Sequence, residues 1–270
     1  MHKGGLRPPL HPRGIMYTFR VFTIRMSRKS EISTQELAAG HYEGERYRGG
    51  HARWYHDWWT REMLARVSVR GRVLDDGCGT GILLESIPAG ACTVVGIDIS
   101  RAMLKHAGPK GGRLVLGDSQ RLPFADGCFD LVIGRSLLHH LPDPALGILE
   151  MARVIRPGGE MIVVDTNASL LSLVPRALAV RGEHFSRDHK NLRAEKLVRT
   201  IGESFHVDDV VYFGYLAYPM GFPDIVDLGR VVPWPGAVTK ILTRIDGWIA
   251  RVPLLRTQSW AVMIKGTRRG

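Results

Sequence analysis

The sequence predicts an α/β fold in which a mostly parallel sheet is covered by helices on both faces. From residue 71 onward, short apolar runs alternate with segments of helical periodicity, the pattern of repeated strand–helix–strand units. The runs at 94–97 and 161–164 contain no polar residue, as expected for strands that are buried on both faces. Glycines at alternate positions directly follow the first of these strands, which places a tight turn at one edge of the sheet.

Seven strands are expected along the chain. The first five are predicted at 72–75, 93–98, 113–116, 129–134 and 160–165, with helices at 81–87, 101–106 and 144–155 between them. A helix at 193–201, a strand at 207–213 and a last strand at 260–265 follow. Right-handed crossovers bring the carboxyl ends of parallel strands to one edge of the sheet, where ligands of such folds bind.

An insertion at about 214–257 separates the last two strands and contains a predicted amphipathic helix. Its apolar residues recur at the spacing of one helical face: Val238, Ile241, Leu242, Ile245, Trp248, Ile249 and Val252. Lys240, Thr243, Arg244 and Arg251 are assigned to the opposite face. We expect the apolar face to cover the ligand edge of the sheet as a helical cap. A contact between two copies of the chain would give the same pattern.

The net charge of +11 is concentrated at the N-terminus. Residues 1–30 hold seven of the 37 basic residues, no acid and several prolines, a composition typical of a flexible, solvated tail. Residues 31–70 are predicted as a helical cap segment whose first helix begins with a capping box, Ser33 with Glu36. The many aromatic and histidine residues at 41–59 are expected to pack on a core, with stacking on nucleobases as the alternative.

Composition restricts the class of protein further. The length suits one domain at 71–270 together with its cap insertion. Three widely spaced cysteines predict neither a disulfide framework nor a metal site, which favours the cytoplasm as the compartment. No stretch has the roughly 18 consecutive apolar residues of a membrane span, so no integral membrane association is expected.

Four elements at the ends of successive strands carry the functional argument. The first is the turn Asp75-x-Gly77-x-Gly79-x-Gly81, whose glycine spacing differs from the Gly-x-Gly-x-x-Gly of dinucleotide sites. The second is Asp98, where a carboxylate at a strand end can accept hydrogen bonds from two ribose hydroxyls. The third is the Gly117-Asp118-Ser119 turn, and the fourth is the Leu122-Pro123-Phe124 segment that leads into the fourth strand.

With these motifs the sequence resembles the class I S-adenosylmethionine-dependent methyltransferases, in the branch similar to quinone and small-metabolite enzymes. The resemblance covers roughly 71–165 and implies a Rossmann-like seven-stranded sheet with an antiparallel last strand. It also implies a set of cofactor-binding residues: Asp75, Gly77, Cys78, Gly79 and Gly81 around the methionine part, Asp98 and Ile99 at the ribose, Asp118 and Ser119 at the adenine, and Arg135 near the sulfonium. Asp76 departs from the family, which usually has an apolar residue there.

The chemistry of a sulfonium cofactor is consistent with this assignment. The cofactor carries no phosphate, so its site needs acids for the ammonium and ribose groups rather than an anion-binding loop. Methyl transfer is an in-line displacement, in which alignment supplies much of the acceleration, and a general base is needed only where the acceptor must lose a proton early. His139 and His140 are the nearest candidate bases, although the resemblance also allows them a purely structural role in the turn.

The sequence therefore predicts an enzyme that transfers a methyl group from S-adenosylmethionine to an oxygen, nitrogen or carbon of a small-molecule or lipid-like acceptor. Candidate acceptor-pocket residues in the variable segments are His184, His189, Tyr215 and Tyr218. Two alternatives stay open: an RNA methyltransferase, suggested by the basic tail, and a non-catalytic subunit that binds the cofactor. The ending of the fourth strand, Gly-Arg-Ser-Leu-Leu, lacks the motif type used to methylate base amines, so a nucleic-acid partner is not expected.

Overall fold

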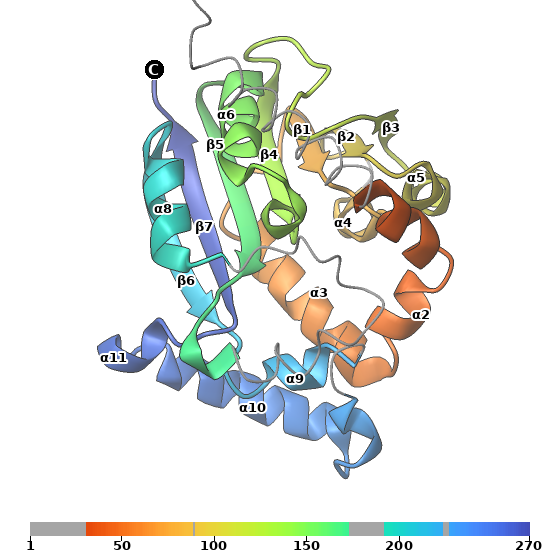
Figure 1. The fold of residues 1–270 in the computed structure, drawn as a ribbon, viewed down its shortest axis with the longest axis vertical. Coiled ribbons are helices and arrows are strands. Elements are labelled where there is room, and N and C mark those ends of the chain that lie inside the picture. The colour runs from red at the N-terminus through yellow and green to blue at the C-terminus, as the bar shows by residue number, and fades with distance from the viewer. Residues whose placement is uncertain (1–30, 89, 173–191, 224–226) are drawn as a thin grey trace, which may run out of the picture.

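The computed structural model describes residues 31–88, 90–172, 192–223 and 227–270, so the predicted tail at 1–30 lies outside the described residues. Seven strands form one sheet in the order β3-β2-β1-β4-β5-β7-β6 (Figure 1). Their bounds are Arg72–Asp76 (β1), Thr93–Asp98 (β2), Arg113–Leu116 (β3), Phe129–Arg135 (β4), Ile155–Thr166 (β5), Phe205–Phe213 (β6) and Ala261–Arg268 (β7). The pairs among β1 to β5 are parallel, and β7 runs antiparallel to both β5 and β6. The predicted mostly parallel sheet with an antiparallel last strand is confirmed.

Two strands extend three or more residues beyond their predicted bounds. β5 begins at Ile155 rather than at residue 160, because Ile155 pairs with Phe129 before a register shift and the ladder resumes at Leu131. β7 continues to Arg268, since it pairs along its length with β5 on one side and β6 on the other. The Pro-Gly-Gly sequence at 157–159 hid the start of β5, because these residues are uncommon inside strands.

Helices cover both faces of the sheet, and each face has its own apolar cluster. On one face, α6 (Pro144–Val154) and α8 (Ala194–Gly202) pack around buried strand residues such as Leu74. On the other, α3 (Gly50–Leu64), α4 (Ile82–Ser86) and α9 (Tyr218–Gly221) pack around residues such as Val73. Further α-helices are α2 (Tyr42–Arg46), α5 (Arg101–Ala107), α10 (Pro235–Ile249) and α11 (Pro253–Arg256), and short 3₁₀ helices occur at Gly108–Lys110, Leu138–His140 and Leu228–Arg230.

The predicted capping box at the start of the N-terminal helical segment is wrong. The chain is already helical at residue 31, upstream of Ser33, so Ser33 lies inside the helix rather than at its cap. The Glu36 carboxylate instead accepts hydrogen bonds from Ser100 Oγ (3.0 Å) and from the backbone N–H of Ala102 (3.2 Å). Glu36 therefore ties the N-terminal segment to the first turn of α5, where a carboxylate also interacts favourably with the helix dipole.

The aromatic residues of α3 contribute to the core, as the packing interpretation of this segment predicts. Tyr55 is fully buried and Trp59 is 3% exposed. The Trp59 ring contacts the rings of Phe213 and Phe222, with centroid distances of 5.6 and 6.0 Å. These contacts join α3 to β6 and to the segment that follows α9, so α3 belongs to the body of the domain.

The orientation of α10 differs from the prediction. Thr239 and Asp246 face inward and are buried, and Leu242 packs against the apolar cluster around α3, whereas Ile241, Ile245 and Trp248 are exposed. Asp246 sets this orientation, because its carboxylate accepts backbone N–H bonds from Tyr215 (2.9 Å), Leu216 (2.8 Å) and Ala217 (3.1 Å). Hydrophobic periodicity could not reveal a carboxylate that anchors the inward face.

We expect Asp246→Ala to reduce the free energy of unfolding by about 3 kcal/mol, because it leaves three amides, two of them in buried residues, without their acceptor. Urea unfolding measures the effect. The matched control is Asp57→Ala, which removes a carboxylate from an exposed pair with Arg53 and should change stability by no more than about 0.5 kcal/mol. Equal effects of the two substitutions would contradict this role of Asp246.

Candidate functional site

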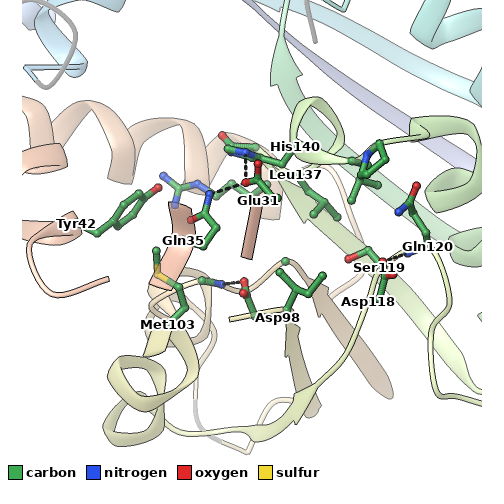
Figure 2. Close-up of a pocket in the computed structure, with 17 residues that line it drawn as sticks. Glu31, Gln35, Tyr42, Asp98, Met103, Asp118, Ser119, Gln120, Leu137 and His140 are labelled. Atoms are coloured by element: carbon green, nitrogen blue, oxygen red, sulfur yellow. Dashed lines mark hydrogen bonds and ion pairs between the residues drawn. The ribbon is translucent and has the colours of Figure 1, made fainter. Parts of the chain in front are cut away.

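A pocket opens at the carboxyl ends of β1 to β4 and encloses about 780 Å³ of empty space, part of it open to solvent (Figure 2). Eight of the residues expected from the sequence line it: Gly77, Gly79, Asp98, Ile99, Asp118, Ser119, Arg135 and His140. The N-terminal helical segment supplies another part of the wall through Glu31, Gln35 and Tyr42.

The glycine turn after β1 forms part of the pocket wall. Gly77, Gly79 and Gly81 have φ values of 75°, 53° and 81°, a backbone region that glycine adopts without steric cost. A Cβ at Gly77 would come within 2.7 Å of the Leu137 side chain, and a Cβ at Gly81 within 3.0 Å of Ala107. A Cβ at Gly79 would meet no atom within 4 Å. Gly79 therefore faces open space, where a ligand can approach the backbone closely.

Asp98 anchors this turn from the end of β2. Its Oδ2 accepts the N–H of Gly79 and its Oδ1 accepts the N–H of Ser100, both at 2.9 Å. Burial raises the pKa of Asp98, and these backbone hydrogen bonds oppose the rise because they stabilise the carboxylate. A carboxylate offers about four lone-pair sites, so after two backbone bonds Asp98 can still accept from two hydroxyl groups. Its place in the wall of the pocket makes those sites available to a ligand.

Asp75 and Asp76 are consecutive buried acids whose side chains lie on opposite faces of β1. Burial is the main cause that raises the pKa of Asp75 to about 8, while Arg135 lowers it. Burial likewise raises the pKa of Asp76 to about 7, while the Ser119 hydroxyl, which donates to Asp76 Oδ1 at 2.6 Å, lowers it. One oxygen of each carboxylate has no hydrogen-bond partner among the described residues. The atypical Asp76 thus points into the protein, where it accepts the hydrogen bond of the Ser119 hydroxyl and so positions that side chain.

Arg135 belongs to a hydrogen-bonded group that the sequence did not reveal. Its guanidinium donates to His56 Nδ1 (2.9 Å) and lies over the Trp59 ring, 4.9 Å from the centroid. The Trp59 indole N–H also donates to His56 Nδ1 (3.0 Å), and His56 Nε2 lies 2.9 Å from the carbonyl oxygen of Gly221. Two donors at Nδ1 require the neutral tautomer with the proton on Nε2. Burial and the nearby Arg135 lower the pKa of His56 well below its usual value, in agreement with that tautomer.

The two candidate bases have different environments. His139 Nδ1 is 2.7 Å from Asp165 Oδ1, and the other Asp165 oxygen accepts the backbone N–H groups of Leu138 and His139. Burial alone would raise the pKa of Asp165, but the contact with His139 holds it below the usual value. His139 is not in the pocket wall, whereas His140 is, with its Nδ1 2.8 Å from Glu31 Oε1 (Figure 2). Of the two, His140 is the one that a ligand can reach.

Other predicted residues lie behind the pocket wall. Asp75 is buried, Cys78 packs its sulfur against the Cα side of Gly96, and Gly81 is the N-cap of α4. Tyr215 and Tyr218 are also buried, and neither lines the pocket. His184 and His189 lie outside the described residues.

Several lining residues were missed by the sequence reasoning. They are Glu31, Gln35, Tyr42, Met103, Gln120, Ser136, Leu137, Leu141 and Pro142. Gln120 directly follows Ser119, and the missed residues between 136 and 142 follow Arg135. They therefore belong to loops in which the sequence had already identified a site residue. Glu31, Gln35 and Tyr42 carry no such signal, because only tertiary packing brings the N-terminal segment over the sheet edge. Within the described residues, no group of three or more His, Cys, Asp or Glu could hold a metal ion, and no helix is long and apolar enough to cross a membrane.

Comparison with known proteins identifies the central segment. Residues 74–163 match the family model described as a methyltransferase domain. The chain is 39% identical over 106 residues to the demethylmenaquinone methyltransferase of Mycolicibacterium vanbaalenii. The matched segment makes up 39% of this chain and 46% of the relative. It is 33% identical over 135 residues to the Staphylococcus aureus demethylmenaquinone methyltransferase. Here the matched segment makes up 46% of this chain and 56% of the relative. The match thus spans about half the length of these curated relatives.

Residues 74–163 thus resemble a class I methyltransferase domain. The similarity to this family model and to these relatives agrees with the resemblance that the sequence predicted. The fold is shared with an S-adenosylmethionine-dependent methyltransferase from Thermotoga maritima, with a TM-score of 0.63, 16% identity and coverage of 88% of this chain and 100% of the other. It is also shared with the [4+2]-cyclase SpnF, with a TM-score of 0.56, 19% identity and coverage of 79% and 80%. The latter is named for a different reaction, so the fold by itself does not establish methyl transfer.

We expect Asp75→Asn to reduce the pH dependence of stability of the ligand-free protein. A carboxyl group with a folded pKa of about 8 binds a proton in the folded state, but not in the unfolded state, between about pH 4 and pH 8. Stability contributed in this way is lost as the pH rises through 8. In urea unfolding, the wild type should therefore lose at least about 1 kcal/mol more than Asp75→Asn between pH 6 and pH 8.5. Parallel stability curves for the two proteins would show that Asp75 is ionised throughout this range.

Proposed function

We propose that this protein binds S-adenosylmethionine in the pocket above Gly79 and transfers its methyl group to a small-molecule or lipid-like acceptor. The observation that carries the proposal is the arrangement at the end of β2. There Asp98 holds the Gly79 turn with two backbone hydrogen bonds and lines the open space that the turn faces. The side-chain chemistry around this space suits a phosphate-free cofactor that carries both positive charge and a carboxylate, because Asp75, Asp76 and Asp98 adjoin the turn together with one basic residue, Arg135.

Each part of the cofactor has a candidate partner in the chain. Asp98 is proposed to accept hydrogen bonds from the ribose hydroxyls, and Asp118 and Ser119 to flank the adenine. Asp75 lies behind the pocket wall, and its carboxyl group, once ionised, is the candidate counter-charge for the ammonium group. Arg135, with a buried Nε that has no partner among the described residues, is the candidate for the carboxylate of the methionine part. The cofactor supplies an electrophilic methyl group on a sulfonium.

The residues of this chain would act mainly by alignment and by control of protons. The hydrogen bond to His56 and the contact with the Trp59 ring hold the Arg135 guanidinium in place at the pocket. Glu31 carries its carboxylate against His140 and also accepts from Gln35 Nε2 at 2.8 Å. When the acceptor must lose a proton, His140 is the proposed base, because the Glu31 carboxylate would stabilise the imidazolium that forms.

An aromatic quinol is the acceptor class that we propose to test first. The relatives are named for demethylmenaquinone, and the chain covers about half of their length. The ring carbon of a quinone is electron-poor, whereas the reduced quinol is electron-rich and carries an ionisable hydroxyl group. A quinol would therefore use both features of the proposed site, a methyl donor and a nearby base.

Removal of the Asp98 carboxylate should abolish most cofactor affinity. We expect Asp98→Ala to weaken binding of S-adenosylhomocysteine at least about 100-fold, since two hydrogen bonds from hydroxyls to a charged acceptor contribute roughly 3 kcal/mol or more. Isothermal titration calorimetry measures the affinity. Asp126→Ala, which removes an exposed carboxylate that pairs with Arg153, is the control and should bind normally. Absence of binding by the wild type, or unchanged binding by Asp98→Ala, would reject the proposed cofactor site.

The two histidines should respond differently to substitution. With reduced demethylmenaquinone and radiolabelled S-adenosylmethionine, we expect His140→Gln to lower kcat at least about tenfold. His139→Gln should mainly lower thermal stability, because it breaks the buried contact with Asp165. The same assay with an RNA acceptor tests the alternative of RNA methylation. Failure to transfer the methyl group to any acceptor, with normal cofactor affinity, would favour a non-catalytic subunit.

A further inference from the structure

The exposed apolar side chains of the described chain gather at the end formed by the cap insertion. Eleven of the fifteen large apolar residues exposed in the described ranges lie at 170–171, 216 and 231–255. Hydrogen bonds connect these segments, since the Leu170 N–H donates to the Gln258 side chain and the Leu216 N–H donates to Asp246 on α10. In Figure 1, α10 and α11 lie together at the lower end of the molecule, beyond the end of β5.

The apolar residues of α10 form an outward stripe. Ile241, Ile245, Trp248 and Val252 follow helical spacing and are 54%, 41%, 74% and 44% exposed. Trp234, at the N-cap of α10, is 81% exposed and has a φ of 48°, a region that non-glycine residues rarely adopt. We call these five residues the cap patch. The inward face of α10 is already occupied by Thr239, Leu242 and Asp246, so the stripe does not belong to the core.

The charges around the cap patch are mostly basic, and the adjoining acid Asp227 pairs with Arg230 at 2.8 Å. Between residues 228 and 257 the chain carries five basic residues, Arg230, Lys240, Arg244, Arg251 and Arg256, and one acid. That acid, Asp246, is 4% exposed and is hydrogen-bonded to backbone amides inside the domain. The exposed surface of this segment therefore combines tryptophan and isoleucine side chains with cations. This composition is typical of helices that lie in the interface of an anionic membrane.

We propose that the cap patch docks the protein reversibly on an anionic lipid membrane surface, with α10 lying in the interfacial plane. A second copy of the chain fits the patch less well. A symmetric dimer would bring the basic residues of the two copies together without acids to neutralise them. Anionic lipid head groups supply the missing opposite charge, and the interface accepts the exposed tryptophans.

Docking in this orientation would connect the membrane-bound helix to the site through packed side chains. α10 packs through Leu242 on the apolar cluster that contains Tyr55 and Trp59 of α3, and α3 also carries His56, which holds Arg135 at the pocket. The interaction rests on the surface of the cap and not on methyl transfer. Its test can therefore succeed or fail independently of the proposed function.

The test is sedimentation of the full-length protein with large unilamellar vesicles of phosphatidylcholine, with or without 30% phosphatidylglycerol. We expect binding to the anionic vesicles and a blue shift of tryptophan fluorescence. The double variant Ile245→Ser/Trp248→Ser should weaken this binding at least about tenfold. The matched control is Leu146→Ser/Leu149→Ser, which changes two leucines that are 42% and 52% exposed on α6, and it should bind within about twofold of the wild type. Both variants keep the basic tail, so they report on the cap patch alone.

A charge variant tests the other half of the proposal. Lys240→Gln/Arg244→Gln should weaken binding to the anionic vesicles, and its melting temperature should match that of the wild type because both residues are exposed. Three results would overturn the proposal: no wild-type binding to anionic vesicles, unchanged binding by Ile245→Ser/Trp248→Ser, or equal losses in that variant and the α6 control. A wild-type dimer that this cap variant converts to monomers, with no vesicle binding, would assign the patch to a second copy.

Discussion

The candidate site depends on hydrogen bonds that fasten three consecutive amides to the end of β2. The N–H groups of Gly77 and Cys78 both donate to the Ile97 carbonyl oxygen at 2.9 Å, and the N–H of Gly79 donates to Asp98 at the same distance. The turn can take this path because its glycines adopt positive φ. Because the turn is fixed in this way, the open side of the turn and the carboxylate of Asp98 have fixed relative positions before any ligand binds. Such preorganisation lowers the cost of ordering the site upon binding.

Buried charge is concentrated around this turn. Asp75, Asp76 and Asp98 all have raised pKa values, chiefly because they are buried, and Arg135 is the basic group that lowers the pKa of Asp75. Buried acids without full hydrogen bonding destabilise a ligand-free fold. Their presence together at one sheet edge is typical of functional sites, where binding of a cationic ligand would compensate the unfavourable charge.

The N-terminal segment completes the pocket, and the cap packs on the domain at the other end of the sequence. Glu36 fastens the N-terminal segment to α5, and Glu31 and Gln35 of the same segment reach the pocket. At the other end of the chain, Asp246 fixes α10 against the amides at 215–217. In both places a single carboxylate that accepts several hydrogen bonds decides how a helix lies on the domain. The outward stripe of α10 is a direct consequence of that orientation.

The sequence alone determined the sheet, the strand ends and the residues that follow them. The short apolar runs and the helical period of 3.6 residues, together with the spacing of Gly77, Gly79 and Gly81, are local properties that need no knowledge of packing. They located Asp98, Asp118 and Arg135 at one sheet edge, where the structure has them. Asp76 was recognised as atypical, but its hydrogen bond to Ser119 became apparent only from the positions of β1 and the turn after β3.

Tertiary structure decided the rest, because it depends on contacts between residues far apart in the chain. Glu31 meets His140, Glu36 meets Ser100, and His56 meets Arg135 across separations that no periodicity encodes. The outward stripe of α10 follows from Asp246, a charged residue within an apolar pattern that is buried because it accepts three distant amides. Local spacing specifies which face of a helix is apolar. The partners of its polar side chains decide which face turns toward the core.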